Sequence, residues 1–385
     1  MAALSPVVNL DTIDLYAAAA SVHGDGSLMV SPLSILYCSM LLYLGAGGST
    51  KTNLESSFHL DSAFYSDQSA ALSAFANGLS YFQNATGNTP DDFLIMSLVN
   101  EIFVSNVVSL KPDYQKSVSQ LQSIAQTKDF VNNPEQARQD INADVAKNTA
   151  YTIQNLLPQG TITPQTVLVL VNTLYFKSTW TNKFTESSTA KAPFTMLNGN
   201  AVQVDMMHQT SSLRYVEDDQ LDIQCVELPF YSQNASMLIL LPRKAAGLRN
   251  LEKALTQQSL QALSQKASLT RVDLSLPKFT FSSNYNLIPM LQKIGVSDAL
   301  DKLKANFTAM VTGNQQLYVS DGVHQTFISV DEKGTEASAA TAIVITALSI
   351  QAGTPVVFKA DHPFLFLIRN NPSKAIMFIG RVESF

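Results

Sequence analysis

The chain has 385 residues, of which 46% are hydrophobic and 15% are charged, and its formal net charge is -6. This apolar content is enough to build a large core and excludes an intrinsically disordered chain. Acidic and basic residues are interspersed and leave no basic surface for nucleic acid or an anionic membrane, so we expect neither partner.

In chain order, the first third of the sequence is typical of helices. Three apolar-periodic segments, at residues 10–21, 31–44 and 69–82, have Ser or Asp at their starts and Gly at their stops. No internal repeat, low-complexity tract or long linker divides the chain. We therefore expect a single domain that covers residues 1–385.

From about residue 166 the pattern changes to β-branched and aromatic runs that are typical of strands. Many strands with few helices between them indicate antiparallel or mixed sheets, so the expected fold class is α+β and not a doubly wound fold. The expected strands are residues 167–176, 224–229, 237–241, 272–276, 317–319, 327–330, 356–358, 364–368 and 375–379.

Only two cysteines are present, Cys38 and Cys225, and each lies in an apolar stretch where a free thiol usually behaves as a small buried hydrophobe. Two cysteines rule out a disulfide scaffold and a zinc site built on cysteines, but whether they pair stays open. The N-terminus lacks the pattern of a secretion signal, which a processed secreted chain lacks too. We expect an extracellular protein, with the cytoplasm as the alternative.

The residues that carry enzyme chemistry do not form a motif. The five histidines are scattered singly, without metal-ligand spacing, and there is no Gly-x-Ser-x-Gly elbow. Residues 45–51 resemble a phosphate loop, but they follow a helix and lack the final Gly-Lys-Ser/Thr, so we interpret them as a helix stop. We expect a protein that is not an enzyme, with no cofactor and no metal.

One segment is unusual for a soluble protein, because residues 337–358 contain no charged side chain. Read with a period of two, positions 335, 337, 339, 341, 343 and 345 form a face of small or β-branched residues. A core strand pair is the ordinary interpretation. However, a strand of ten or more residues exceeds the usual length, and the four alanines among 337–342 are poor strand formers. Small residues suit a segment that slides between two existing strands.

The sequence resembles the serpin family along nearly its whole length. The motifs that carry the resemblance are Val-Ser-Pro-Leu-Ser-Ile at 30–35, Val-Asn-Thr-Leu-Tyr-Phe-Lys at 171–177 followed by Trp180, Glu-Leu-Pro-Phe at 227–230, Leu-Pro-Lys-Phe at 276–279, residues 319–324, Glu-Lys-Gly-Thr-Glu-Ala-Ser-Ala-Ala-Thr at 332–341, and Asp-His-Pro-Phe-Leu-Phe-Leu-Ile-Arg at 361–369. Ser338 is a mild departure from the family pattern.

The resemblance implies a serpin fold of three β-sheets and eight to nine α-helices, with a C-terminal reactive-centre loop at about residues 332–356. It also implies a suicide-substrate inhibitor of serine proteases. A protease cleaves the loop and forms an acyl-enzyme, and insertion of the loop into the central sheet of this metastable fold traps the covalent complex. Counting from Glu332, as in inhibitory members, places the reactive bond at Leu348-Ser349.

A leucine before the bond suits a chymotrypsin-like target, including cathepsin G-like enzymes. Ala347, Thr346 and Ile345 leave an elastase-like target open. The other alternative is a non-inhibitory serpin, a carrier or chaperone, although the hinge holds none of the charged, proline or bulky residues that usually mark such members.

The same resemblance assigns roles to three groups of residues, and we expect an ion pair between Glu332 and Lys278. The hinge is Glu332, Lys333, Gly334, Thr335, Glu336, Ala337, Ser338, Ala339, Ala340 and Thr341. The shutter, under the strands that must part, is Ser31, Ser34, Asn172 and His324. The breach, where the loop first enters, is Trp180, Lys278 and Glu332.

Two expectations concern association with other molecules. The charge-free, β-prone loop favours a monomer that tends to form loop-sheet polymers. Between Lys51 and Lys111 there is no lysine or arginine, so we do not expect heparin-type activation through the residue 69–82 helix.

Overall fold

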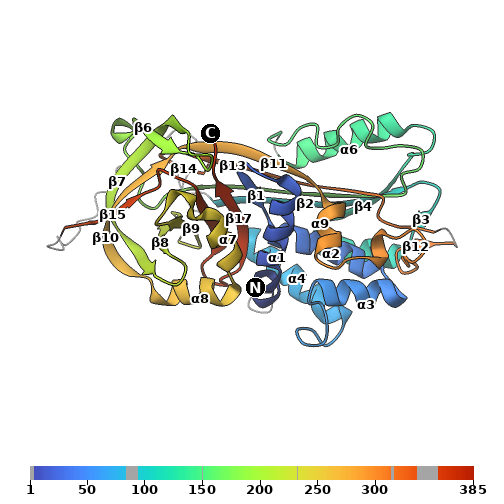
Figure 1. Ribbon diagram of the computed structural model, residues 1–385. Helices are drawn as coiled ribbons and strands as arrows, with labels where there is room; N and C mark the ends of the chain where they lie inside the picture. Colours follow the sequence, from blue (N-terminus) through green and yellow to red (C-terminus); the bar gives the residue numbers. More distant parts are fainter. Residues whose placement is uncertain (1–3, 84–93, 150, 232, 314–315, 336–353) are drawn as a thin grey trace.

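The computed structural model describes residues 4–83, 94–149, 151–231, 233–313, 316–335 and 354–385. These ranges hold nine α-helices (Figure 1). The helices are α1 (Ser5–His23), α2 (Pro32–Gly45), α3 (Gly48–Ser57), α4 (Gln68–Gln83), α5 (Pro112–Gln120), α6 (Pro134–Asn148), α7 (Leu248–Ala254), α8 (Gln257–Lys266) and α9 (Leu287–Lys293), with short 3-10 turns η1 (Glu186–Ser188), η2 (Ala245–Gly247) and η3 (Asp298–Leu300).

Seventeen strands lie in the same ranges. They are β1 (Leu28–Val30), β2 (Leu94–Ser105), β3 (Ser109–Leu110), β4 (Ile124–Lys128), β5 (Leu168–Thr179), β6 (Ala190–Thr195), β7 (Ala201–Asp218), β8 (Ile223–Pro229), β9 (Ala235–Pro242), β10 (Ser268–Pro277), β11 (Phe279–Asn286), β12 (Val311–Thr312), β13 (Asp321–Val330), β14 (Gly334–Thr335), β15 (Val356–Lys359), β16 (Phe364–Asn370) and β17 (Ile376–Val382).

The strands form three sheets. The largest has nine strands in the order β1-β17-β16-β9-β8-β7-β10-β15, with β6 paired to β7 off this path. The second has six strands in the order β11-β13-β14-β5-β2-β4, and β13 also pairs directly with β5. The third is the β12-β3 pair. The expected α+β class and the three sheets are confirmed.

Helix α2 links the two large sheets, since it contacts β5 and β2 on one side and β17 on the other. It begins at Ser31, whose side chain accepts a hydrogen bond from Ser34 N, and Pro32 occupies its first turn. All of its residues are buried, as expected of a helix that is apolar on every side. The main core therefore surrounds α2.

A second, smaller core covers the other face of the six-stranded sheet. Ile141 and Val145 of α6 pack there with Phe103 of β2 and with Val169 and Val171 of β5. Figure 1 shows α6 on one side of this sheet, with α2, α3 and α4 on the other. The middle of the six-stranded sheet, around β2 and β5, is therefore covered on both faces, whereas β11 at its edge alternates buried and exposed residues.

The expected helices at 10–21, 31–44 and 69–82 correspond to α1, α2 and α4. The strand expected at residues 317–319 is wrong. Leu317 and Val319 are buried, but Val319 N donates to Ala299 O and Ser320 N to Leu168 O, so this run packs as an irregular segment without a ladder. Strand β2 lies in the part of the chain that the pattern indicated as mainly helical.

The two cysteines, Cys38 and Cys225, are both free and buried. Burial raises the pKa of each thiol to about 12, so neither is a thiolate at neutral pH. Among the described residues, no helix combines the length and the apolar character needed to cross a membrane.

Candidate functional site

The candidate site is the junction of β5 and β13 in the middle of the six-stranded sheet. The two strands pair in parallel from Asp321 opposite Val169 to Phe327 opposite Tyr175. Beyond that point they diverge, and β14 lies between them. Thr335 of β14 pairs antiparallel with Ser178 of β5 and with Val330 of β13. The start of the expected hinge is thus already part of the sheet.

Gly334 has to be a glycine at this position. A Cβ there would lie 2.1 Å from Ser178 O and 2.6 Å from Thr179 Cα, and both of these are backbone atoms that cannot move aside. Its φ of 153° is also rarely adopted by other residues. The close approach of two backbones therefore explains this glycine.

Thr335 is buried against β5 and is held by its hydroxyl as well as by its backbone. Ser178 N donates to Thr335 Oγ1 at 2.9 Å, and Thr335 Oγ1 donates to Ser178 O at 3.3 Å. A small side chain with a hydroxyl fits this buried position because its polar atom is satisfied. Of the ten hinge residues predicted from the sequence, Glu336, Ala337, Ser338, Ala339, Ala340 and Thr341 lie outside the described residues, as do Leu348 and Ser349.

The predicted breach residues surround the point where β14 enters the sheet. Trp180 is buried and stacks on Phe230 with ring centroids 4.6 Å apart. Its Nε1 donates to Asp331 O at 2.9 Å, and its backbone N donates to Lys333 O at 2.9 Å. The indole therefore supports the turn that leads into the hinge.

Glu332 forms the expected ion pair, with its Oε2 2.9 Å from Lys278 Nζ. Thr189 Oγ1 donates to the other carboxylate oxygen at 2.7 Å. Burial by itself raises the pKa of Glu332, but the hydrogen bonds from Lys278 and Thr189 outweigh it and hold the pKa below its usual value. Glu332 therefore stays ionised, and its ion pair joins the first residue of the hinge to Lys278, which lies between β10 and β11.

The four predicted shutter residues meet under β5 and β13, and all four are fully buried. Ser31 N donates to His324 Nε2 at 3.1 Å, so this ring nitrogen is the acceptor and Nδ1 carries the hydrogen. His324 Nδ1 then donates to Asn172 Oδ1. Asn172 Nδ2 donates to Ser34 O at 2.8 Å and to Ser34 Oγ at 2.6 Å. One network therefore connects α2, β5 and β13.

The histidine in this network, His324, is neutral. His324 is enclosed, and burial lowers its pKa to about 3, so the ring is uncharged at neutral pH. Tyr285 of β11 stacks on the ring with centroids 6.0 Å apart. The network holds strands together without placing a charge in the core.

Two further residues belong to the site although the sequence reasoning missed them. Asn100 of β2 accepts a hydrogen bond from Asn172 Nδ2, and Thr189 binds Glu332. No motif marks either residue. Only the pairing of β2 with β5, which sets Asn100 opposite Asn172, could have identified the first.

Comparison with known proteins decides the family. The family model described as "Serpin (serine protease inhibitor)" matches residues 9–385. The chain belongs to the serpin family. Its fold is therefore the serpin fold, and the family is described by protease inhibition and not by catalysis.

Known serpins match along nearly the whole chain. Human serpin B11 is 33% identical over 391 residues and horse leukocyte elastase inhibitor is 32% identical over 379 residues, and in both comparisons the match covers 97% of each chain. Mouse antithrombin-III is 35% identical over 371 residues, which are 95% of this chain and 78% of the relative.

Solved structures agree with this assignment. Serpin48 of the insect Tenebrio molitor has a TM-score of 0.87 at 28% identity, covering 99% of this chain and 98% of that one. Human thyroxine-binding globulin has a TM-score of 0.88 at 26% identity, covering 100% and 99%.

Proposed function

We propose that this serpin is a suicide-substrate inhibitor of serine proteases that inserts its cleaved loop between β5 and β13. One observation carries the proposal: Gly334 and Thr335 are already paired between the diverging ends of these two strands. The chain that follows Thr335 leads to the proposed reactive bond. An inserted loop would extend a strand that has already begun.

The pairing of β14 also supports a register for that strand. Thr335 lies opposite Ser178 and Val330. If the strand continues antiparallel to both neighbours, each following residue pairs with the residue one position earlier in β5 and in β13. Position 341 then falls between Asn172 and His324. These two residues are direct partners in the present β5–β13 ladder. The same strand therefore fits both neighbours without a bulge.

The balance of hydrogen bonds favours such an insertion. The β5–β13 ladder now spans seven residue pairs, from Asp321 to Phe327 of β13. A strand inserted between β5 and β13 breaks this ladder and forms two new ladders, one with each strand. The net gain is on the order of seven backbone hydrogen bonds, each worth about 1 kcal/mol. Ile343 and Ile345 would add apolar burial on the α2 side. These terms oppose deacylation.

For the target, we propose cleavage at Leu348-Ser349 by a chymotrypsin-like protease, with cathepsin G-like enzymes included. An elastase-like protease is the second candidate, favoured by the relatives named leukocyte elastase inhibitor. The partner in either case is a serine protease held in a covalent acyl-enzyme complex. For the compartment, we propose the extracellular space, with the cytoplasm as the alternative, and two buried thiols are compatible with either.

The test is to mix the protein with chymotrypsin and with an elastase, run denaturing gels, and determine the mass of the released C-terminal peptide. A gel-stable complex and a peptide that begins at Ser349 would establish inhibition and the bond together. A complex with elastase alone, or another first residue, would move the bond. Cleavage without any complex would favour a carrier, as thyroxine-binding globulin bound to thyroxine exemplifies among the similar structures.

A further inference from the structure

Strand β15 is where the chain returns to the protein after the proposed reactive bond. It is the last strand of the nine-stranded sheet and pairs in parallel with β10, with Val356 opposite Val272. Because the two strands run in the same direction, the chain before Val356 approaches the sheet from the Ser268 end of β10. The chain that follows the proposed bond is therefore anchored at that end of the sheet.

Two large apolar side chains are exposed on one face of these strands. Leu269 is 67% exposed and Val357 is 62% exposed. Val357 pairs with Asp273, and Leu269 precedes Asp273 by four residues, so both side chains point to the same side of the sheet. The other side holds the buried residues Val272 and Phe358. The core therefore does not require Leu269 or Val357 to be apolar.

Cationic side chains lie next to Leu269. Arg214 is opposite Leu269 in the β7–β10 register, and its side chain is 45% exposed. Arg214 Nη2 donates to Ser264 O at 2.9 Å and its Nε lies 3.4 Å from Glu227 Oε2, so its side chain is anchored and its charge is already paired. Arg271, two residues from Leu269 on the same face, is also exposed. Because Asp273 lies on the same face, opposite Val357, the charges on this surface are mixed, and the exposed apolar side chains are what a protein partner would contact here.

The segment from Ser349 to Thr354, here called the tether, joins the proposed reactive bond to β15, and its length indicates which partner contacts this surface. Ser349 and Thr354 are separated by five Cα–Cα steps, which span at most about 18 Å. A protease domain of about 230 residues has a radius of gyration of about 17 Å and is therefore much wider than this tether is long. A protease that bound at Leu348-Ser349 would therefore be held beside the Leu269 end of the sheet.

We propose that the face of β10 and β15 around Leu269 and Val357 is a second contact surface for the target serine protease. It binds the protease during the encounter, before the loop is cleaved, and so raises the rate of inhibition. This surface rests on the proposed function, and it deepens that function by adding recognition outside the loop.

The test is a double variant, Leu269→Thr with Val357→Thr, compared with wild type and with Leu303→Thr. Threonine is β-branched, a shape that strands favour, and both positions are exposed, so the fold should be retained. Leu303 is 91% exposed and lies between η3 and β12, and β12 is at the opposite end of the molecule from β15 (Figure 1). It is the matched control.

Three quantities are measured with a protease that wild type traps: the association rate constant, the stoichiometry of inhibition and the melting temperature. We expect the rate constant of the double variant to fall about fivefold or more, which is typical of losing interface anchors, with the other two unchanged. Leu303→Thr should match wild type.

Three results would overturn the proposal, and they are distinguishable. Equal rate constants for the double variant and wild type would remove the second surface but leave the inhibitor function intact. A slower rate with a raised stoichiometry would place these residues in loop insertion instead of recognition. The absence of a complex between wild type and every chymotrypsin-, elastase- and trypsin-like protease would overturn the proposed function, and this surface with it.

Discussion

His324 donates its Nδ1 hydrogen to Asn172 Oδ1, and this bond joins β13 to β5, the two strands between which the loop is proposed to insert. Neighbouring strands lie about 4.8 Å apart, so a strand placed between them would move these two to about 9.6 Å. The bond must break for the loop to enter. The same contact therefore stabilises the present pairing of β5 with β13 and opposes insertion of the loop between them.

The first prediction concerns the removal of this bond. His324→Ala leaves Ser31 N and Asn172 Oδ1 without their partner in a fully buried site. We expect the free energy of unfolding to fall by about 2–4 kcal/mol, measured by urea unfolding. His208→Ala is the control, because His208 is half exposed and should change stability by less than about 0.5 kcal/mol. Equal stabilities of the two variants would contradict a structural role for His324.

The second prediction is a pH dependence from the same residue. Burial lowers the pKa of His324 to about 3, whereas a histidine in an unfolded chain titrates near 6.5. Between these values the unfolded chain binds a proton that the folded protein does not. Stability from this residue is therefore complete above about pH 6.5 and is lost as pH falls, by up to about 1.4 kcal/mol per unit. The stability difference between wild type and His324→Gln should shrink from pH 7 to pH 5, and a constant difference would refute the assignment.

The third prediction has the opposite sign and concerns Glu101 of β2. Burial raises the pKa of this carboxyl to about 7, although Asn148 Nδ2 donates to it at 3.0 Å. Its folded pKa lies above the unfolded value, so its contribution to stability is lost as pH rises towards 7. Glu101→Gln should be more stable than wild type by about 2 kcal/mol at pH 8 and nearly equal to it at pH 5. Melting curves at the two pH values are the measurement, and a gain at pH 5 alone would count against it.

The fourth prediction concerns the docked hinge. In Gly334→Ala the new Cβ would meet Ser178 O, so we expect Gly334 and Thr335 to leave the sheet. Trp180 is the only tryptophan and is hydrogen-bonded to the carbonyls of Asp331 and Lys333, so its fluorescence should change. Gly199→Ala is the control, since Gly199 also has a positive φ but no atom within 4 Å of the new Cβ. An unchanged spectrum in Gly334→Ala would show that the hinge stays docked.

The fifth prediction tests the register proposed for the inserted strand. Position 341 would lie on the core side between Asn172 and His324, so Thr341→Arg would bury a charge there. We expect this variant to be cleaved by the protease without forming a gel-stable complex. Gln351→Arg, beyond the proposed bond, should still form the complex. Trapping by Thr341→Arg at the wild-type stoichiometry would show that the register is different.

The ion pair of Glu332 with Lys278 illustrates how far the sequence could lead. Family motifs at 276–279 and 332–341 were enough to anticipate it, and the structure has it at 2.9 Å. The partner Thr189 could not be anticipated in this way, because it follows η1 in a segment without a motif. Motifs therefore identify the residues that a family shares, but not the local partners that form hydrogen bonds with those residues.

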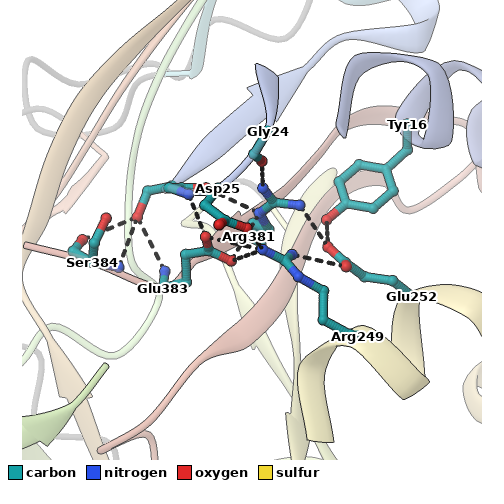
Figure 2. Close-up of polar contacts among 10 residues, drawn as sticks. Tyr16, Gly24, Asp25, Arg249, Glu252, Arg381, Glu383 and Ser384 are labelled. Atoms are coloured by element: carbon teal, nitrogen blue, oxygen red, sulfur yellow. Dashed lines mark hydrogen bonds and ion pairs between the residues drawn. The ribbon is translucent and has the colours of Figure 1, made fainter. Parts of the chain in front are cut away.

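By itself, the sequence determined the family, the α+β class, three of the nine described helices and eight of the seventeen described strands, because composition, periodicity and motifs are local properties of the chain. Only the tertiary structure decided which strands are neighbours and in which register. Asn172 and His324 are 152 residues apart, and their bond exists because β5 and β13 pair in parallel with these two residues opposite each other. Alternation along a strand determines which face a side chain occupies, but its partner depends on the assembled sheet. For that reason Asn100, the docking of Thr335 and the free state of both cysteines could be recognised only in the folded protein. The polar network around Arg381 follows the same principle, since Arg381 pairs with Glu252 and donates to Gly24 O, and Tyr16 donates to Glu252 from a distant part of the chain (Figure 2).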